Sequence, residues 1–191
     1  MKVYFTAAIS ALSQYGDNYK KIVSSLEDLG HTVIADHILK KSLTQVLYQE
    51  KPEEHEAYYK SMIKNISSSD LLVAEVSFPS TVHVGHELTL ALEKDKPVLA
   101  LFIKGKRPVL FWGITSDKFY ATEYELGDLK KTLKDAIEYL TEQMDTRFNF
   151  FISPKIATYL DWIAKKKRLP RAVYLRRLIE EDMKNDKNYS K

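Results

Sequence analysis

Two short segments of this chain, residues 70–76 and 98–103, are apolar at almost every position rather than at every second one. An unbroken apolar run of this length is typical of a central strand in a parallel sheet, because helices cover both faces of such a strand. A helical pattern over residues 85–94 separates the two runs. Strands that alternate with helices at this spacing predict an α/β fold with a doubly wound, Rossmann-like parallel sheet.

The remaining hydrophobic pattern extends this alternation over the first three quarters of the chain. A polar loop is expected over residues 10–17, and Gly30 stands where a glycine often ends a helix. A glutamate, Glu75, ends the first buried run, where we expect a structural role or contact with a substrate hydroxyl. The expected strands are 3–9, 32–35, 70–76, 98–103 and 118–122, and the expected helices are 19–29, 53–67, 85–94 and 128–144.

Charge divides the chain into two parts. Residues 145–191 hold 12 Lys and Arg against 6 Asp and Glu, whereas the rest of the chain holds 17 against 20. A basic segment beside a mildly acidic body suggests an anionic partner such as nucleic acid, or only a solvated helix face. We therefore expect an α/β domain at 1–145 and a small separate module at 146–191.

The C-terminal module has the pattern of one strand followed by two helices. Apolar residues alternate over 147–153, Ser153 and Pro154 suit the start of a helix, and a second helical stripe follows the basic segment 165–170. So short a segment cannot bury its own apolar faces or pair a lone strand. Self-association is therefore expected of it.

Several functional classes lack their motifs. The chain has no cysteine, which excludes thiol nucleophiles, and none of its 6 glycines forms a dinucleotide or triphosphate loop. His83 and His86 have metal-like spacing, but no third ligand is evident, so we expect neither metal nor cofactor. No apolar run approaches the roughly 18 residues of a membrane span. We expect a soluble, cytoplasmic protein without membrane contact.

One carboxylate draws attention to the segment after the first buried strand. Glu87 lies in Pro79-Ser80-Thr81-Val82-His83-Val84-Gly85-His86-Glu87-Leu88, close to the expected start of a helix. The helix dipole there favours the ionised carboxylate that a nucleophile needs. Position alone also fits simple N-terminal capping, so both interpretations stay open.

Successive segments of residues 1–144 resemble the nucleoside 2-deoxyribosyltransferase-like superfamily, and most closely its deoxynucleoside 5'-monophosphate N-glycosidases. The segments that carry the resemblance, in order, are Val3-Tyr4-Phe5, Gly30 to His37, Ser69 to Ser77, Pro79-Ser80 and Gly85-His86-Glu87-Leu88.

The resemblance implies cleavage or transfer at the N-glycosidic bond of a nucleoside or its 5'-monophosphate. Glu87 matches the family's nucleophile, and Tyr4 matches a catalytic tyrosine near the sugar. His37 falls in the segment that faces the base, and Ser80 matches a serine that holds the phosphate. The substrate-binding residues implied are, together, Ile9, Ser10, His37, Ser77, Ser80 and Gly85.

The chain departs from the family pattern at several positions. Met62 stands where the family has an aspartate, the first loop reads Ala7-Ala8-Ile9-Ser10 in place of a phosphate-binding motif, and Pro108 aligns with a serine contributed across the family's dimer. Basic residues of the next loop, Lys104, Lys106 and Arg107, are alternative partners for a phosphate. These departures leave open a nucleotide-sensing regulator without turnover.

The C-terminal module resembles the ribbon-helix-helix family of DNA-binding dimers. In that family two strands form a ribbon in the major groove, and the second helix begins at a phosphate. The resemblance implies that Arg147 and Asn149 read bases and that Arg171 contacts the backbone. Dimerisation of the whole chain through this module, without DNA, is an equal alternative.

Overall fold

A computed structural model describes residues 1–40, 51–142, 151–167 and 171–186 of the chain. These residues form two compact units, Met1–Asp145 and Thr146–Lys191. Each unit is described by itself below.

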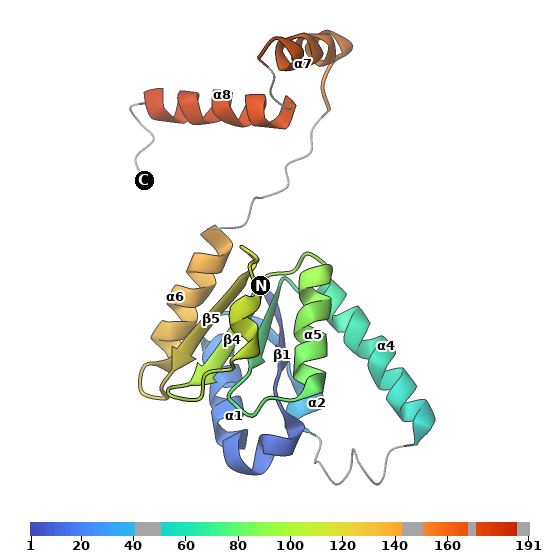
Figure 1. Cartoon of the computed structure of the whole chain (residues 1–191), viewed down its shortest axis with the longest axis vertical. Helices are drawn as coiled ribbons and strands as arrows, with labels where there is room; N and C mark the ends of the chain where they lie inside the picture. Colours follow the sequence, from blue (N-terminus) through green and yellow to red (C-terminus); the bar gives the residue numbers. More distant parts are fainter. Residues whose placement is uncertain (41–50, 143–150, 168–170, 187–191) are drawn as a thin grey trace. The chain divides into compact units, whose positions relative to one another are not determined.

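The first unit is built on a parallel sheet of five strands in the order β2-β1-β3-β4-β5 (Figure 1). Every neighbouring pair is parallel, with Tyr4 opposite Leu72 and Val73 opposite Leu99. This confirms the α/β class and the parallel sheet that the sequence predicts. The strands are β1 (Lys2–Thr6), β2 (Thr32–Ile34), β3 (Leu71–Glu75), β4 (Val98–Ile103) and β5 (Phe119–Tyr124).

Helices connect successive strands and cover both faces of the sheet (Figure 1). The helical elements of this unit are η1 (Ile9–Ala11), α1 (Leu12–Asp28), α2 (Asp36–Leu39), α4 (Pro52–Ser68), α5 (Val82–Glu93), η2 (Leu110–Gly113) and α6 (Leu129–Glu142).

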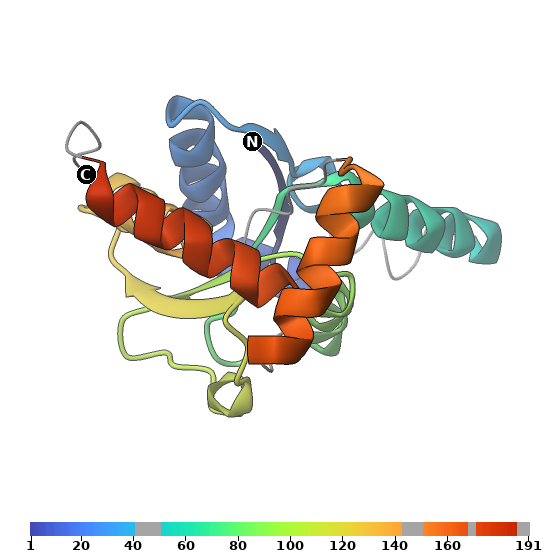
Figure 2. The same ribbon diagram turned by 90° about the horizontal axis from the view of Figure 1, so that it is seen from above.

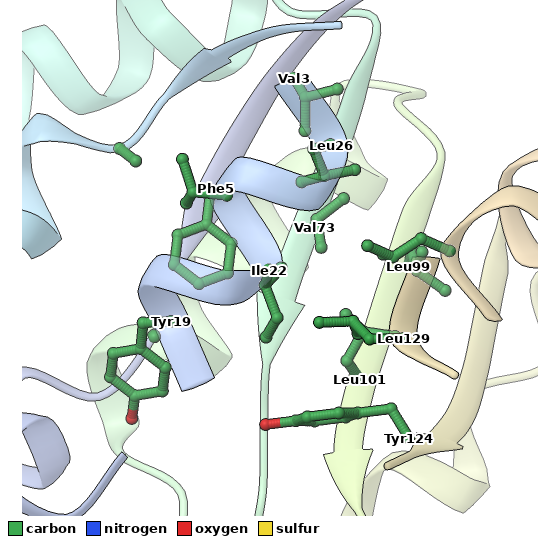
Figure 3. Close-up of a cluster of buried hydrophobic side chains, with 14 of the residues drawn as sticks. Val3, Phe5, Tyr19, Ile22, Leu26, Val73, Leu99, Leu101, Tyr124 and Leu129 are labelled. Carbon is green, nitrogen blue, oxygen red and sulfur yellow. The ribbon is translucent and has the colours of Figure 1, made fainter. Parts of the chain in front are cut away.

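Two apolar clusters lie on opposite faces of the sheet, because alternate side chains of each strand point to opposite sides. Figure 3 shows the first cluster, in which Phe5 and Leu101 of the sheet meet Ile22 of α1 and Leu129 of α6. The second cluster packs α4 and α5 against the other face through Met62 and Leu88. Central strands buried on both faces explain the unbroken apolar runs of β3 and β4.

Local signals at the helix ends explain where several elements begin and end. Gly30 follows α1 with φ +85°, a conformation that glycine adopts without steric cost. Thr81 caps α5, because its side chain accepts a hydrogen bond from the Val84 amide at 3.5 Å.

Three expectations about helices are wrong. Residues 12–17 are not a loop but the first turns of α1, because Tyr15 and Tyr19, one turn apart, are both buried against the sheet. Packing there overrides the weak helix propensity of the polar residues. The helix α5 begins at Val82 rather than Gly85, so His83 lies within it. The helical pattern of residues 53–67 also predicts that Tyr59 lies on the apolar face of α4, but this side chain is 47% exposed.

The second unit consists of α7 (Pro154–Lys167) and α8 (Arg171–Asn185), seen as two consecutive helices in Figure 2. The Ile156 amide donates to the Ser153 hydroxyl at 3.4 Å, as expected of an N-cap. The helix α7 continues through Lys167 and so includes the first part of the basic segment 165–170. Among the residues whose burial the structure describes, the apolar cluster of this unit holds Leu160, Ile163, Tyr174 and the partly buried Leu175.

The strand expected at 147–153 lies partly outside the described residues. Residues 151–153 have no strand conformation, and a ribbon strand needs a second chain to pair with, so this expectation stays a prediction. Among the described residues, no helix has both the length and the apolar character that crossing a membrane requires.

Candidate active site

The strand order places a change of winding direction between β1 and β3, and ligands of doubly wound sheets bind beyond the strand ends at such a point. Tyr4 comes from β1, His37 from α2 after β2, and Glu87 from α5 after β3. The structure brings these three predicted residues together on the face that α4 and α5 cover.

The Glu87 side chain is buried, with 4% of the residue exposed. Its Oε1 accepts a hydrogen bond from the Tyr58 hydroxyl of α4 at 3.4 Å. Its Oε2 is also buried and has no hydrogen-bond partner among the described residues. The carboxylate therefore has one oxygen held by a hydrogen bond and one without such a partner among the described residues.

Burial is the main influence on the Glu87 carboxyl group and raises its pKa. The nearby hydroxyl groups of Thr6, Tyr4 and Tyr58 and the charge of His83 oppose this rise. The helix dipole acts most strongly in the first turn, and Glu87, the sixth residue of α5, lies beyond that turn. The expected stabilisation of the ionised form by the helix terminus is thus outweighed by removal of the group from water.

Tyr4 forms one wall of the site. Only 1% of it is exposed, and its hydroxyl has no hydrogen-bond partner among the described residues. Burial raises the pKa of this hydroxyl, and the neighbouring Glu87 and Tyr58 raise it further, so Tyr4 is a neutral donor at physiological pH. Its ring stacks on the His37 imidazole with centroids 4.7 Å apart. A flat aromatic surface thus lies beside the carboxylate.

Met62 occupies the position at which the family resemblance implies an aspartate. Its side chain is 4% exposed and packs in the apolar cluster with Tyr4 and Leu72. A thioether offers no proton and only weak hydrogen bonding. Whatever an aspartate would contribute here must come from another residue or be missing.

Ser80 and Gly85 lie on the segment that leads into Glu87. The Ser80 hydroxyl is buried without a hydrogen-bond partner among the described residues. A Cβ added at Gly85 would meet nothing within 4 Å, so space is open beside that backbone. Both features suit contact with a ligand, whereas Ser10 is exposed and Ile9 packs partly against the apolar cluster of α1.

Ser77 belongs to a separate polar network. Its hydroxyl donates to the Glu75 carboxylate and accepts from the Ile103 amide at 2.8 Å. The Tyr124 hydroxyl donates to Glu75 at 3.4 Å, and Asn18 donates to Tyr124 at 3.0 Å. Burial raises the pKa of Glu75, opposed by Ser77, Tyr124 and Lys106. Figure 3 shows Tyr124 in the apolar cluster that includes Ile22 of α1 and Leu129 of α6, whereas Tyr4 belongs to the cluster on the other face.

The basic residues after β4 have different surroundings. Lys104 forms an exposed ion pair with Glu125 at 2.7 Å. Lys106 donates to the Tyr15 hydroxyl and lies 5.1 Å from the centre of that ring. Arg107 is exposed.

Two observations bear on the metal-like spacing of His83 and His86. Within the described ranges, no three His, Cys, Asp or Glu side chains gather as a metal site would require. The imidazole of His86 stacks on Tyr59 with centroids 6.0 Å apart.

The predicted DNA-binding residues are only partly described. Arg147 and Asn149 lie outside the described residues. Arg171 forms an ion pair with Asp161 of α7, within the same unit. Its predicted phosphate contact therefore stays a prediction.

Tyr58 and Thr6 are neighbours of Glu87 that the sequence pattern did not single out. Thr6 follows Tyr4 by two residues in β1, and strand alternation therefore puts both on one face. Tyr58 precedes Met62 by four residues in α4, which is the spacing of one helical face. The spacing of two residues in the strand and of four residues in the helix can be read from the sequence. Neither spacing indicates a contact with Glu87 until the position of α5 is known.

Several curated proteins that are similar to this chain are named as nucleotide N-hydrolases. It is 32% identical over 147 residues to a protein of Thermofilum pendens named as a 2'-deoxynucleoside 5'-phosphate N-hydrolase, covering 75% of this chain and 95% of that protein. A protein of Syntrophotalea carbinolica with the same name is 30% identical, covering 72% and 94%. The 5-hydroxymethyl-dUMP N-hydrolase of Rattus norvegicus is 29% identical, covering 74% and 88%.

A solved structure shares the fold. The CMP N-glycosidase BcmB of Clostridium botulinum matches with a TM-score of 0.52 and 16% identity, covering 70% of this chain and 99% of that one. No protein-family model matches the chain.

The parallel sheet and these relatives define an α/β protein of the nucleoside 2-deoxyribosyltransferase-like superfamily. Within it, the chain belongs to the family of 2'-deoxynucleoside 5'-phosphate N-hydrolases.

Proposed function

We propose that this protein hydrolyses the N-glycosidic bond of a nucleotide, with Glu87 as the nucleophile. The observation that carries the proposal is the buried Glu87 carboxylate, which keeps Oε2 unpartnered among the described residues at the ligand edge of the sheet. The names of the relatives supply the substrate class, a 2'-deoxynucleoside 5'-phosphate.

The proposed reaction has two displacements, as in glycosidases that retain configuration. Oε2 of Glu87 bonds to the anomeric carbon while the bond from that carbon to the base nitrogen breaks. The base leaves with the bonding electron pair and takes up a proton. Water then attacks the same carbon, the ester bond to Glu87 breaks, and the carboxylate is restored as the water loses a proton. Transfer to a second base in place of water would make the enzyme a deoxyribosyltransferase.

The neighbouring residues have matching proposed roles. The buried Tyr4 hydroxyl donates to the carboxylate or to the sugar, and the His37 imidazole presents a flat face to the base. The buried Ser80 hydroxyl, together with the open space beside Gly85, suits the phosphate. Ile9, Ser10 and Ser77 are proposed ligand residues on family resemblance alone.

Exclusion of water supports this chemistry. A nucleophilic carboxylate that is 4% exposed reacts in a medium where charge on the sugar is weakly screened by solvent. The same burial disfavours the ionised carboxylate. Donors around Glu87 must therefore offset the penalty, and Thr6, Tyr4 and Tyr58 are the groups that do so.

The test is base release from a panel of deoxynucleoside 5'-monophosphates and the corresponding nucleosides, measured by chromatography. We expect the full chain to release base, and Glu87→Gln, which keeps the shape of the side chain, to reduce the rate by at least about a thousandfold. Glu93→Gln is the matched control, because Glu93 is an exposed glutamate on the same helix.

Two results would contradict the proposal. Glu87→Gln could retain the rate of the unaltered chain, which would remove the nucleophile. Alternatively, the chain could bind nucleotides without releasing base from any of them, which would favour the nucleotide-sensing regulator.

We further propose that the second unit associates with a second copy of itself. Its apolar cluster is very small, and large side chains of both helices are exposed, with Trp162 at 53% and Ile179 at 61%. A core of this size does not stabilise a unit alone. Several basic side chains have intrachain contacts, since Lys166 lies over Trp162 and Arg171 pairs with Asp161. These contacts favour self-association over DNA binding as the role of the unit.

A further inference from the structure

We propose that Tyr58 is the positioning residue of Glu87: its hydroxyl holds Oε1 and thereby leaves Oε2 as the atom that attacks the sugar. The proposal rests on the proposed function and names a residue that the family resemblance does not supply. In this chain, Tyr58 of α4 then partly replaces the aspartate that the resemblance implies at position 62.

The two oxygens of Glu87 have unequal surroundings. Oε1 lies 3.4 Å from the Tyr58 hydroxyl, while Oε2 is equally buried and has no hydrogen-bond partner among the described residues. A separation of 3.4 Å is long for a hydrogen bond between oxygens, and such contacts often tighten when a substrate is bound. Donation to one oxygen restrains the rotation of the carboxylate and thereby fixes the orientation of the other oxygen.

The geometry of α4 explains why position 58 can replace position 62. Tyr58, Met62 and Ile66 are spaced by four residues and lie on the face of α4 that packs on the sheet, with Met62 and Ile66 buried. A helix that connects two parallel strands runs antiparallel to them, so its N-terminal turns lie at the carboxyl ends of the strands. Tyr58 is one turn closer to that edge than Met62, and its longer side chain reaches Glu87 from there.

Tyr58 also extends the aromatic wall of the site. Its ring centroid lies 6.2 Å from that of His37, which in turn stacks on Tyr4. The titratable groups beside Glu87 from other elements are thus Tyr4 of β1 and Tyr58 of α4, and His37 of α2 is in ring contact with both. The charge of His83 acts on Glu87 from α5 itself. Of these, Tyr58 is the one whose hydroxyl donates to Oε1.

The first test removes only the hydroxyl, in Tyr58→Phe. The loss is that of one hydrogen bond to a charged group, so we expect kcat to fall by about 10- to 100-fold. KM should change little, because the bond is made to the enzyme's own carboxylate. The acidic limb of the pH profile of kcat/KM should move to higher pH, since the ionised nucleophile loses a donor.

Tyr59→Phe is the matched control. It removes one hydroxyl from the neighbouring tyrosine, which is 47% exposed and stacks on His86. We expect its kcat and pH profile to equal those of the unaltered chain. A Tyr58→Phe enzyme with unchanged kcat and an unchanged acidic limb would overturn the proposal.

The second test does not depend on turnover. Carbon-13 labelling of the glutamate carboxyl groups follows the titration of Glu87 by NMR, with Glu87→Gln assigning the signal. We expect Tyr58→Phe to raise the Glu87 pKa and Tyr59→Phe to leave it unchanged. If the chain releases no base, the proposed function fails, yet this titration still decides whether Tyr58 controls the carboxylate. A Glu87 signal that titrates identically in Tyr58→Phe and the unaltered chain refutes the inference.

Discussion

The buried Glu87 carboxylate should reduce the stability of the fold, so that the substitution expected to abolish base release should also stabilise the protein. The group is 4% exposed, its Oε2 lacks a hydrogen-bond partner among the described residues, and burial raises its pKa. In Glu87→Gln a neutral amide of nearly the same shape replaces the ion. The new NH₂ group can donate to the Tyr4 hydroxyl, which also lacks a partner among the described residues.

The expected magnitude follows from the penalty for one unsatisfied buried oxygen. Leaving such a group without a partner costs about 1–3 kcal/mol, and more when it is charged. For a domain of this size 1 kcal/mol shifts the melting temperature by about 2–4 °C. We therefore expect Glu87→Gln to raise Tm by roughly 3 to 10 °C at a pH above the raised pKa that Glu87 has in the folded chain.

The gain should depend on pH in a definite direction. The pKa of Glu87 is higher in the folded state than its ordinary value of 4.5, so the folded state holds the proton more tightly. Stability of the unaltered chain is then greatest below the ordinary value and falls as pH rises through the folded pKa. The advantage of Glu87→Gln should accordingly be smallest below pH 4.5 and should grow as pH rises through the folded pKa. Glu75, which is also buried with a raised pKa, leaves a residual slope of the same sign.

Thermal unfolding followed by near-ultraviolet circular dichroism at pH 4, 6 and 8 measures these differences. The control Glu93→Gln should have the Tm of the unaltered chain at every pH, because Glu93 is exposed. A lower Tm for Glu87→Gln at pH 8, or an equal gain at pH 4 and pH 8, would refute the reasoning.

Two further outcomes test the other proposals. Trp162→Glu should convert a dimer to a monomer in sedimentation equilibrium of the full chain, whereas Lys155→Glu, at an exposed polar position of the same helix, should leave the dimer intact. Salt-sensitive binding of duplex DNA by the unaltered chain, lost in Arg171→Ala, would instead support the regulator. Ser80→Ala should raise KM for a 5'-monophosphate about tenfold, as for one hydrogen bond to a charged group, and leave KM for the nucleoside unchanged. Equal KM changes for both substrates would contradict a phosphate contact.

The parallel sheet is predictable from sequence because its strongest signal is local. The runs that became β3 and β4 are apolar on both faces, and few other elements of this length have that pattern. Gly30 likewise marks the end of α1 by a conformation that depends on a single residue. These features need no knowledge of distant contacts.

The errors occurred where a distant partner decides the structure. The first turns of α1 have a polar sequence, and they form a helix because Tyr15 and Tyr19 pack on strands that lie elsewhere in the chain. Tyr58 and Tyr59 are identical neighbours in sequence, and only the position of α5 makes one of them a contact of Glu87. The sequence predicts a helix at the place of α5. It does not predict the start of that helix, which the cap at Thr81 sets.

The site could be predicted in part for the same reason. His37 and Glu87 follow strand ends and Tyr4 lies within β1, and parallel topology gathers strand ends at one edge. Ser77 also follows a strand end, but the side chain turns to Glu75 on the opposite face. Which face a residue beyond the strand will choose depends on backbone geometry in the loop, and the hydrophobic pattern does not encode that.

The surroundings of Glu87 are assembled from β1, α2, α4 and α5, so no single segment of the chain can hold the carboxylate in its reactive condition. An incompletely folded or nicked chain would expose the same glutamate to water and give it ordinary acidity. The raised pKa of Glu87 is therefore a property of the complete fold and not of any one segment.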